Sequence, residues 1–372
     1  MSNVIKVVLL SKACITALYR GKLSEISKHR DIDLTVIVPS EWRDEHGVLS
    51  FESDGLKEYK VLVEPIVFNG SYHFHFYPTL AKRLEQIQPD ILHVEEEPYN
   101  FATWHAIRVS RLICCKTLFF SWQNIHKTYP WPFSFMESHV LQSVDAAIFG
   151  SESSLKVFHA KGYSGPSEVI PQFGVDTNIF ELSNKKDSCK NQFNIGYIGR
   201  LVNEKGVDML ISVLTMMPDD VRLNVYGSGP DLEYLKQLVF NYNLYNEVIF
   251  TPWISSTKIP QLMHNFDVLV LPSRTTTKWK EQFGRVLIEA MASGIPVVGS
   301  DSGEIPYVIG DAGLIFQEGD VESLKDALMK LYVDPDLRNL LSLQGRKRVQ
   351  DRFTHSIVAN RTVDLYRTIV EC

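Results

Sequence analysis

The sequence lacks any apolar run long enough to cross a membrane. No stretch of about 18 apolar residues occurs in it, and a spanning helix needs about 20. The N-terminal run Val4–Leu10 is interrupted by Lys6 and is too short for a signal peptide. We therefore expect this run to be the first buried strand of a cytoplasmic protein.

Cysteine is scarce and its spacing carries no motif. The chain has an odd number of cysteines and no CxxC pair; they are Cys14, Cys114, Cys115, Cys189 and Cys372. This pattern excludes a disulfide scaffold and a cysteine-based zinc site, and it predicts reduced thiols.

The chain also lacks an excess of positive charge, repeats and low-complexity tracts. The formal net charge is −6 over 372 residues, which argues against nucleic acid as a partner. The length predicts two domains, each with room for its own core, in an ordinary globular protein.

What the sequence does contain is an alternation of apolar strands with helical patterns. Up to about residue 170 the expected strands are Val4–Leu10, Leu34–Val38, Ile91–Val94, Lys116–Ser121 and Asp145–Gly150, and the expected helices are Thr79–Gln86, Phe101–Leu112 and Glu152–Lys161. Such alternation is typical of βαβ units with a parallel sheet covered on both faces.

A second series begins after the polar segment Glu181–Asn191, which is the predicted linker. Its expected strands are Phe193–Ile198, Arg222–Tyr226, Val248–Thr251, Val268–Leu271 and Pro296–Gly299, and its expected helices are Asp320–Tyr332, Pro335–Arg352 and Thr354–Val370. The two series predict an α/β fold in which two Rossmann-like domains face each other across a cleft.

The most informative segment runs from Glu281 to Glu289 and on to Val298. Two carboxylates bracket a Phe-Gly break, and the residues between them have the pattern of a helix that ends at Gly294 before a short strand. On such a helix the two carboxylates would lie about 12 Å apart, at about 1.5 Å per residue. Backbone N–H groups at a helix start favour a diphosphate, and the carboxylates accept hydrogen bonds from sugar hydroxyls. The segment therefore predicts a cradle for a nucleotide-sugar.

A second segment, Phe193–Gly206, is a strand followed by a glycine turn that carries Arg200 and Lys205. The turn leads into an amphipathic helix that is expected to begin near Val207. Two cations at the carboxyl end of a strand are well placed to bind phosphates.

Together these segments resemble the retaining glycosyltransferases of family GT4, which have the GT-B architecture. The resemblance extends over nearly the whole chain, through Ile170–Phe180, Val225–Pro230 and Leu271–Arg274. It implies an acceptor-binding domain over residues 1–175, a donor-binding domain over residues 190–352, and a C-terminal helix from about Phe353 that crosses back to the first domain.

The resemblance also implies roles for individual residues. Arg200 and Lys205 would bind the donor diphosphate, Glu281 would bind the donor sugar, and Glu289 would bind the ribose. The further donor-binding candidates are Gly199 as an enabler of the turn, Phe283 and Gly284 through their backbone N–H groups, Arg285 and Val286. Arg285 either reaches a phosphate or points to solvent.

The N-terminal domain departs from the family pattern in two places. No Gly-Gly pair follows Leu10, and Gln123 or Asn124 stands where the family has a histidine that contacts the donor sugar. His126 is either a substitute for that histidine or an ordinary loop residue. Glu95 and Glu97 follow a buried strand, and either one of them binds the acceptor or an interdomain partner, or they are merely solvated. The aromatic run Tyr129–Phe135 either packs within a loop or contacts a lipid-linked acceptor.

We expect no metal or cofactor, because no Asp-x-Asp set follows a strand. Asp31 and Asp33 precede one, and Asp334 and Asp336 lie between helices. The predicted protein is a metal-independent retaining glycosyltransferase that moves a hexose from an NDP-sugar to a saccharide or lipid-linked acceptor in surface polysaccharide or glycolipid assembly. Its partners are the donor and the acceptor, and peripheral contact with the inner membrane is left open. The alternatives are an NDP-sugar epimerase of the same fold and a non-catalytic nucleotide-sugar-binding protein.

Overall fold

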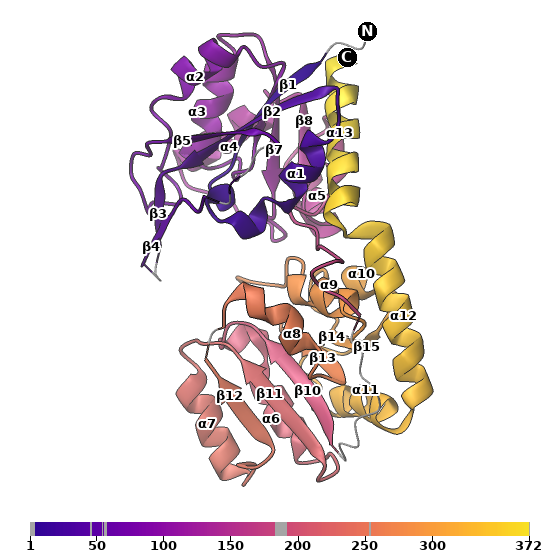
Figure 1. The fold of residues 1–372 in the computed structure, drawn as a ribbon. Coiled ribbons are helices and arrows are strands. Elements are labelled where there is room, and N and C mark those ends of the chain that lie inside the picture. The colour runs from indigo at the N-terminus through magenta and orange to yellow at the C-terminus, as the bar shows by residue number, and fades with distance from the viewer. Residues whose placement is uncertain are drawn as a thin grey trace. The chain divides into compact units, whose positions relative to one another are not determined.

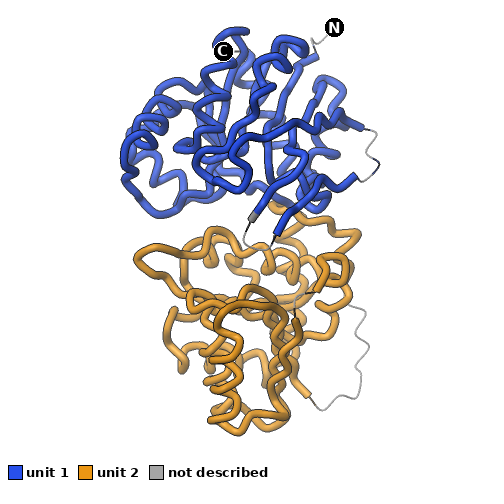
Figure 2. Tube along the Cα trace, turned by 90° about the vertical axis from the view of Figure 1, so that its left-hand side faces the viewer, with its two compact units in different colours: residues 1–174, 355–372 blue, residues 175–354 orange. Residues whose placement is uncertain are grey.

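The computed structural model describes residues 4–44, 47–53, 55, 58–182, 192–252 and 254–371. The chain divides into two compact units (Figure 2). Unit 1 consists of residues 1–174 and 355–372, and unit 2 of residues 175–354. The predicted linker Glu181–Asn191 lies outside the described residues except for its first two, as do Cys189 and Cys372.

Unit 1 is built on a seven-stranded parallel sheet (Figure 1) with the order β5-β2-β1-β6-β7-β8-β9. Its strands are β1 (Ile5–Leu10), β2 (Ile32–Pro39), β5 (Lys60–Glu64), β6 (Ile91–Val94), β7 (Lys116–Ser121), β8 (Ala146–Phe149) and β9 (Ser167–Val169). Its helices are α1 (Gly21–Ser27), α2 (Leu80–Ile87), α3 (Phe101–Ser110), α4 (Phe133–Leu141), α5 (Glu152–Ala160) and α13 (His355–Glu371).

The first strand is apolar on both sides because helices cover both faces of the sheet. Ile5, Val7 and Leu9 pack with α1 and α13, whereas Val8 and Leu10 pack with α2, α3 and α4. Successive side chains of a strand point to opposite faces, so a sheet buried on both faces needs continuous apolar strands. This is why the strands were predictable as short apolar runs.

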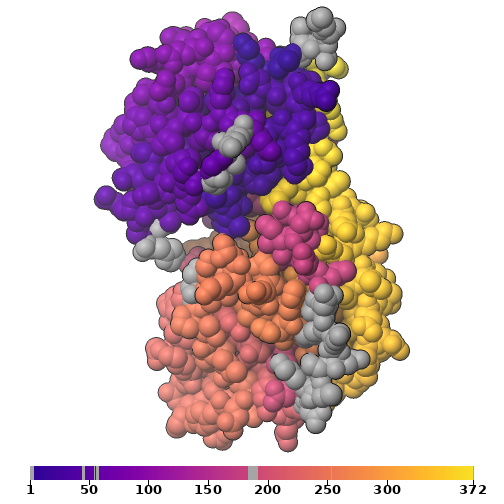
Figure 3. Space-filling view, viewed as in Figure 1, coloured from indigo at the N-terminus to yellow at the C-terminus, as the bar shows by residue number. Residues whose placement is uncertain are grey.

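Helix α13 belongs to unit 1 although about half of the chain separates it from α5. Val358, Val363 and Ile369 are buried in the same core as β1 and α1. Figures 1 and 3 show α13, in yellow, running along the indigo N-terminal part of the chain. The predicted return of the last helix to the first domain is confirmed.

Several elements of unit 1 had no signal in the sequence pattern. A hairpin of β3 (Glu41–Asp44) and β4 (Gly47–Ser50) is short and largely exposed. Helix α4 begins at Phe133, so the aromatic run is only partly a loop. Within that run Tyr129 stacks on Tyr99 with a ring distance of 4.1 Å.

Unit 2 is built on a six-stranded parallel sheet with the order β12-β11-β10-β13-β14-β15. Its strands are β10 (Phe193–Ile198), β11 (Val221–Tyr226), β12 (Val248–Thr251), β13 (Val268–Leu271), β14 (Val297–Ser300) and β15 (Leu314–Phe316). Its helices are α6 (Val207–Leu214), α7 (Leu232–Asn241), α8 (Ile259–Met263), α9 (Arg285–Ala292), α10 (Ile305–Ile309), α11 (Val321–Val333) and α12 (Pro335–Arg352).

Both sheets reverse their strand order at a central strand. β1 lies between β2 and β6, and β10 lies between β11 and β13. Ligands of open α/β sheets bind outside the carboxyl ends of the strands at such a reversal. The segments after β1, β6, β10 and β13 are therefore where a site is expected. Over the described residues, no helix combines the length and the apolar character that a membrane-spanning segment needs.

Candidate active site

The turn after β10 holds Arg200 and Lys205 in a fixed backbone. The Gly199 N–H donates to the Tyr226 carbonyl at 3.0 Å, and the Tyr197 hydroxyl donates to the Arg200 carbonyl at 2.7 Å. The Arg200 residue is exposed, whereas Lys205 ends a short 3₁₀ turn, Asn203–Lys205. Both cations lie beyond the carboxyl end of the central strand, as predicted.

Gly206 brings this turn against the end of β13. Its φ of +66° is in the left-handed region, and a Cβ there would lie 2.1 Å from the carbonyl oxygen of Pro272. Only glycine combines that backbone conformation with so close an approach. The consequence is that Lys205 lies beside the residues that follow β13.

Lys205, Glu281 and Ser273 form one polar cluster in unit 2. The Lys205 Nζ lies 2.5 Å from Glu281 Oε2, and the Ser273 hydroxyl donates to the same oxygen at 2.7 Å. The Lys205 ammonium also lies 4.9 Å from the ring centre of Trp279. The structure thus brings together two of the three predicted catalytic residues, and it adds Ser273.

The helix predicted between the two glutamates is shorter than expected. Helix α9 begins only at Arg285, after Gly284 with φ +79°. The Glu281 carbonyl instead accepts the N–H of Glu304 at 3.2 Å. Glu281 therefore precedes the helix, and the separation of 12 Å along a helix does not apply. Phe283 is buried with its ring against Phe353.

Glu289 lies on the buried part of α9 and is paired with Arg285. It is 5% exposed, and Arg285 Nε lies 2.8 Å from its Oε1. Burial raises the pKa of Glu289 although Arg285 opposes this. Arg285 was expected either to reach a phosphate or to point to solvent, and its contact with Glu289 is a placement that neither expectation included. Val286 is half-buried in the first turn of α9.

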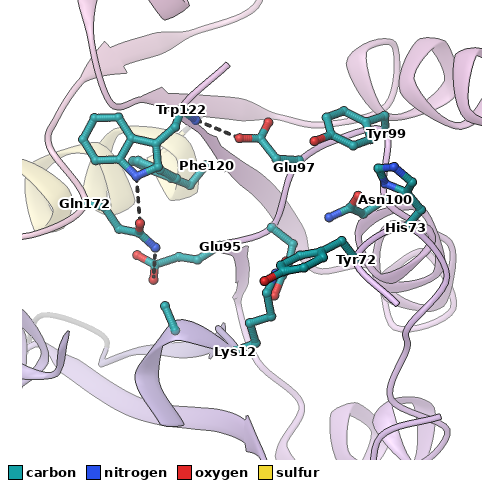
Figure 4. A pocket seen from close by; sticks show the side chains of 12 residues that line it. Lys12, Tyr72, His73, Glu95, Glu97, Tyr99, Asn100, Phe120, Trp122 and Gln172 are labelled. Atoms are coloured by element: carbon teal, nitrogen blue, oxygen red, sulfur yellow. Dashed lines mark hydrogen bonds and ion pairs between the residues drawn. The ribbon is translucent and has the colours of Figure 1, made fainter. Parts of the chain in front are cut away.

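Unit 1 contains a cavity of about 450 Å³ at the carboxyl ends of β1, β6 and β7 (Figure 4). We call it the unit 1 pocket. It is lined by Lys12, Ala13, Tyr72, His73, Glu95, Glu96, Glu97, Tyr99, Asn100, Phe120, Trp122 and Gln172. In Figure 4 Trp122 and Gln172 lie on one side, and Tyr72, His73 and Asn100 lie on the other.

Two of its carboxylates are neutralised by lysines. Glu95 pairs with the buried Lys22 and accepts from the Gln172 amide at 3.2 Å. Glu96 pairs with Lys12 at 2.6 Å. Although burial disfavours its charge, Lys12 and His75 lower the pKa of Glu96 to about 2. The reading of Glu95 as a solvated charge is wrong, because Glu95 is buried in an ion pair.

Glu97 differs because no lysine or arginine pairs with it among the residues described. Its carboxylate accepts from the Ser121 hydroxyl at 2.6 Å and from the Trp122 backbone N–H at 3.0 Å. Burial raises the pKa of Glu97 to about 7, against these hydrogen bonds and the nearby Lys12. A carboxyl group that titrates near neutrality in a pocket is typical of a functional site.

The residues at the expected histidine position do not line this pocket. The Gln123 amide donates to the Ile125 carbonyl at 3.1 Å and accepts from Lys161 at 3.2 Å. Asn124 is buried, and His126 is exposed. Trp122, the residue just before Gln123, lines the pocket.

Sequence reasoning missed Lys12, Lys22, Asn100, Gln172 and Ser273. Lys12 and Ser273 directly follow apolar strands, which is a signal that the pattern offered. The pairing of Lys22 with Glu95 joins positions 73 residues apart, and no local pattern encodes it. Among the described residues, no three His, Cys, Asp or Glu side chains gather as a metal site.

Two Rossmann-like units, with polar residues at the reversal of each sheet, define the GT-B class of protein. Family models agree: Glycosyltransferase Family 4 matches residues 24–178, and Glycosyl transferases group 1 matches residues 178–348. The chain belongs to these GT4-type glycosyltransferases.

Curated relatives match part of their length. The chain is 29% identical over 210 residues to the capsular polysaccharide biosynthesis glycosyltransferase CapM of Staphylococcus aureus, covering 53% of each protein. It is 30% identical over 205 residues to a GDP-mannose-dependent phosphatidylinositol monomannoside mannosyltransferase of Mycolicibacterium smegmatis, covering 51% of this chain and 54% of the relative. The matches span about half the length of these relatives.

Solved structures match the whole fold. A glycosyltransferase from Rickettsia africae superposes with a TM-score of 0.75 at 17% identity and covers 99% of both chains. Anabaena HepE, solved in complex with UDP, superposes with a TM-score of 0.72 at 19% identity, over 98% of this chain and all of that one.

Proposed function

We propose that this protein is a metal-independent retaining glycosyltransferase. It moves a hexose from an NDP-sugar to a saccharide or lipid-linked acceptor in surface polysaccharide or glycolipid assembly. Unit 2 binds the donor and unit 1 binds the acceptor. The protein works in the cytoplasm, with peripheral contact to the membrane when the acceptor is lipid-linked.

The observation that carries this proposal is the cluster of Lys205, Glu281 and Ser273 beside the start of α9. An ammonium group and the first N–H groups of a helix both bind phosphate oxygens. The carboxylate of Glu281, which is paired with the Lys205 ammonium, can accept hydrogen bonds from sugar hydroxyls. The cluster thus offers adjacent places for a phosphate and a sugar.

In the reaction the bond between the anomeric carbon and the diphosphate oxygen breaks, and a bond from that carbon to the acceptor oxygen forms. The acceptor proton passes to the leaving phosphate, on the same face of the sugar. Arg200 and Lys205 stabilise the negative charge that develops on the leaving phosphate, which is electrostatic stabilisation by groups already in place. No protein nucleophile is needed.

Relatives support the donor class. Anabaena HepE, which has the same fold, was solved with UDP and with UDP-glucose. CapM is named for capsular polysaccharide biosynthesis, and the mycobacterial relatives are named as mannosyltransferases that depend on GDP-mannose. UDP-glucose and GDP-mannose are both nucleoside diphosphate-hexoses, which supports a donor of this type.

The direct test is acceptor-dependent release of free NDP from a panel of NDP-sugars. A transferase releases NDP when an acceptor is supplied and forms a glycoside of retained configuration. An epimerase would convert the donor without an acceptor, and a binding protein would do neither. Donor candidates for the panel are found by thermal shift, since a bound ligand stabilises the folded state.

Lys205→Ala should lower kcat/KM by about 100-fold, about 3 kcal/mol, through loss of one stabiliser of the leaving phosphate. The matched control is Lys330→Ala, which removes an exposed lysine on α11 and should leave the kinetics unchanged.

Activity of the wild type should persist in excess EDTA. A Mg²⁺ or Mn²⁺ requirement after chelation would contradict metal independence.

A further inference from the structure

Three donor groups of the unit 1 pocket already bind other residues that line it. Lys12 is held by Glu96, and the Gln172 amide N–H is held by Glu95. The Trp122 indole N–H donates to Gln172 at 2.9 Å, as the dashed line in Figure 4 shows. A phosphate or carboxylate in the pocket would compete with Glu95, Glu96 and Gln172 for these donors.

One acceptor atom of the pocket, in contrast, is left over. The amide oxygen of Asn100 is buried and has no hydrogen-bond partner among the described residues. A buried acceptor without a partner costs about 1–3 kcal/mol. A ligand that donates hydrogen bonds removes that cost, and one that only accepts them does not.

The side chain of Asn100 stands at a position where it would usually have another hydrogen-bond partner. It is the N-cap residue of α3, where an asparagine usually accepts a hydrogen bond from the first turn. Here its side chain makes no capping hydrogen bond. It is 3% exposed and lines the pocket. In Figure 4 its amide lies across the pocket from Gln172.

The charge of the pocket points in the same direction. Above pH 7, where Glu97 is ionised, three carboxylates, those of Glu95, Glu96 and Glu97, face two ammonium groups, those of Lys12 and Lys22. The remaining negative charge repels an anionic ligand and tolerates a neutral one. Tyr72, Tyr99 and Trp122 supply flat faces that pack on an apolar ring face. Pockets for small molecules combine such surfaces with a few polar groups in this volume range.

We infer that the unit 1 pocket receives an uncharged, hydroxyl-bearing sugar ring of the acceptor and rejects groups that carry phosphate or carboxylate. This inference rests on the proposed function, because it treats the pocket as the acceptor site. It narrows the acceptor to one with a neutral terminal sugar. A phospholipid headgroup or a uronic acid would not enter the pocket itself.

The test uses the full chain at pH 8 with saturating NDP and matched pairs of soluble glycosides. Each pair has a methyl hexoside and its uronic acid or 6-phosphate counterpart in the gluco, galacto and manno series. Saturation-transfer NMR gives their relative binding. The neutral member should bind at least about tenfold more tightly in the series that fits, about 1.4 kcal/mol. Equal or tighter binding of the charged members, or binding of neither, would overturn the inference.

Two variants separate recognition from general damage. Glu97→Gln keeps the shape but removes the charge that Glu97 carries above pH 7, so at pH 8 it should lower the preference for the neutral member by about tenfold. Asn100→Ala should weaken neutral binding by about fivefold with little loss of stability, since no cap is lost. Glu85→Gln, on the exposed side of α2, is the control for Glu97→Gln. An unchanged preference in Glu97→Gln, or unchanged binding in Asn100→Ala, would contradict the assignment.

Calorimetry with NDP distinguishes the two levels of failure. Both variants should bind NDP as the wild type does, because their residues belong to unit 1. If the wild type bound no NDP, the proposed function would fail regardless of the glycosides. If NDP bound normally and the charged glycosides bound as tightly as the neutral ones or more tightly, only the inference about the pocket would fail.

Discussion

At the scale of single residues, Lys205 and Glu281 neutralise each other within the polar cluster of unit 2. Their side chains are 18% and 9% exposed, and their charged atoms lie 2.5 Å apart. A donor diphosphate would therefore share Lys205 with Glu281. Glu281 would then turn its remaining lone pairs to the sugar hydroxyls. Each residue holds its partner in place before the donor arrives.

Glu281→Ala and Glu289→Gln should separate donor transfer from nucleotide binding. Glu281→Ala leaves Lys205 available to the diphosphate, so NDP affinity should be retained while transfer slows at least about tenfold, about 1.4 kcal/mol. If Glu289 binds the ribose, Glu289→Gln should weaken NDP binding with little change in kcat, since such a contact acts alike in ground and transition states. Calorimetry with NDP and steady-state kinetics check both. The reverse pattern would mean that the donor is bound in the opposite orientation, with its nucleotide near Glu281 and its sugar near Glu289.

Glu97 should give the protein a pH-dependent stability. Its pKa is raised from 4.5 to about 7 in the folded state, so the folded form holds the proton more strongly. The stability that this provides is complete below about pH 4.5 and is lost as the pH rises through 7. The charged groups near it are Lys12 and Glu96, and Ser121 and Trp122 donate to it.

The measurement is the unfolding free energy of the wild type minus that of Glu97→Gln, from pH 5 to pH 8. The difference should fall by about 2 kcal/mol, less than the full shift because Glu97 is partly exposed. Glu85→Gln serves again as the control. A difference that stayed flat across pH 7 would show that Glu97 is ionised throughout.

At the scale of elements, the parallel strands were the part that the sequence pattern predicted well. Five strands match their predicted bounds, namely β6, β7, β10, β12 and β13, and α12 does so among the helices. The start of α9 was predicted too early because apolar periodicity does not reveal that Gly284 takes a positive φ. In the pocket, Glu95 and Glu97 stood out after a strand, but their partners come from distant segments that only the folded chain brings together.

Gly206→Ala tests the turn that places Lys205. A Cβ there would meet the Pro272 carbonyl at 2.1 Å, so the backbone must move. Gly319 is the matched control: it also has a positive φ, of +78°, but nothing lies within 4 Å of its Cβ position. Gly319→Ala should cost about 1 kcal/mol of backbone strain, and Gly206→Ala should cost about 3 kcal/mol or more.

Urea unfolding measures the stability of both glycine variants, and calorimetry measures their NDP affinity. Gly206→Ala should also weaken NDP binding, because it shifts Lys205, whereas Gly319→Ala should not. Equal losses of stability in the two variants would mean that the turn after β10 adapts without disturbing β13.

At the scale of the whole molecule, unit 1 is assembled from two separate parts of the chain. Arg367 on α13 binds Asp31 with N–O distances of 2.8 and 3.0 Å. The Tyr366 hydroxyl lies 2.7 Å from His93 Nδ1 on β6. Burial lowers the pKa of His93 to about 3, so this imidazole is neutral near pH 7. Helix α13 is thus a core element of unit 1 and joins it by specific polar contacts.

Tyr366→Phe should destabilise unit 1 by about 1–3 kcal/mol, because it leaves a buried imidazole nitrogen without a partner. Hydrogen exchange by mass spectrometry should report faster exchange in β6 and β7 and unchanged exchange in β10 and β11. Arg361→Ala, which removes an exposed ion pair between α13 and Glu168, should have a much smaller effect. Uniform acceleration in both units would contradict the independence of their cores.

The divided unit 1 has a consequence for synthesis on the ribosome. Residues 175–354, which make up unit 2, are translated after most of unit 1 and before α13. At about 5–20 residues per second this interval lasts about 10–40 s. During it the sheet face that α13 will cover, with Val7 and Leu9 of β1, lacks its last helix. This part of the core of unit 1 is therefore completed only after unit 2 has been synthesised.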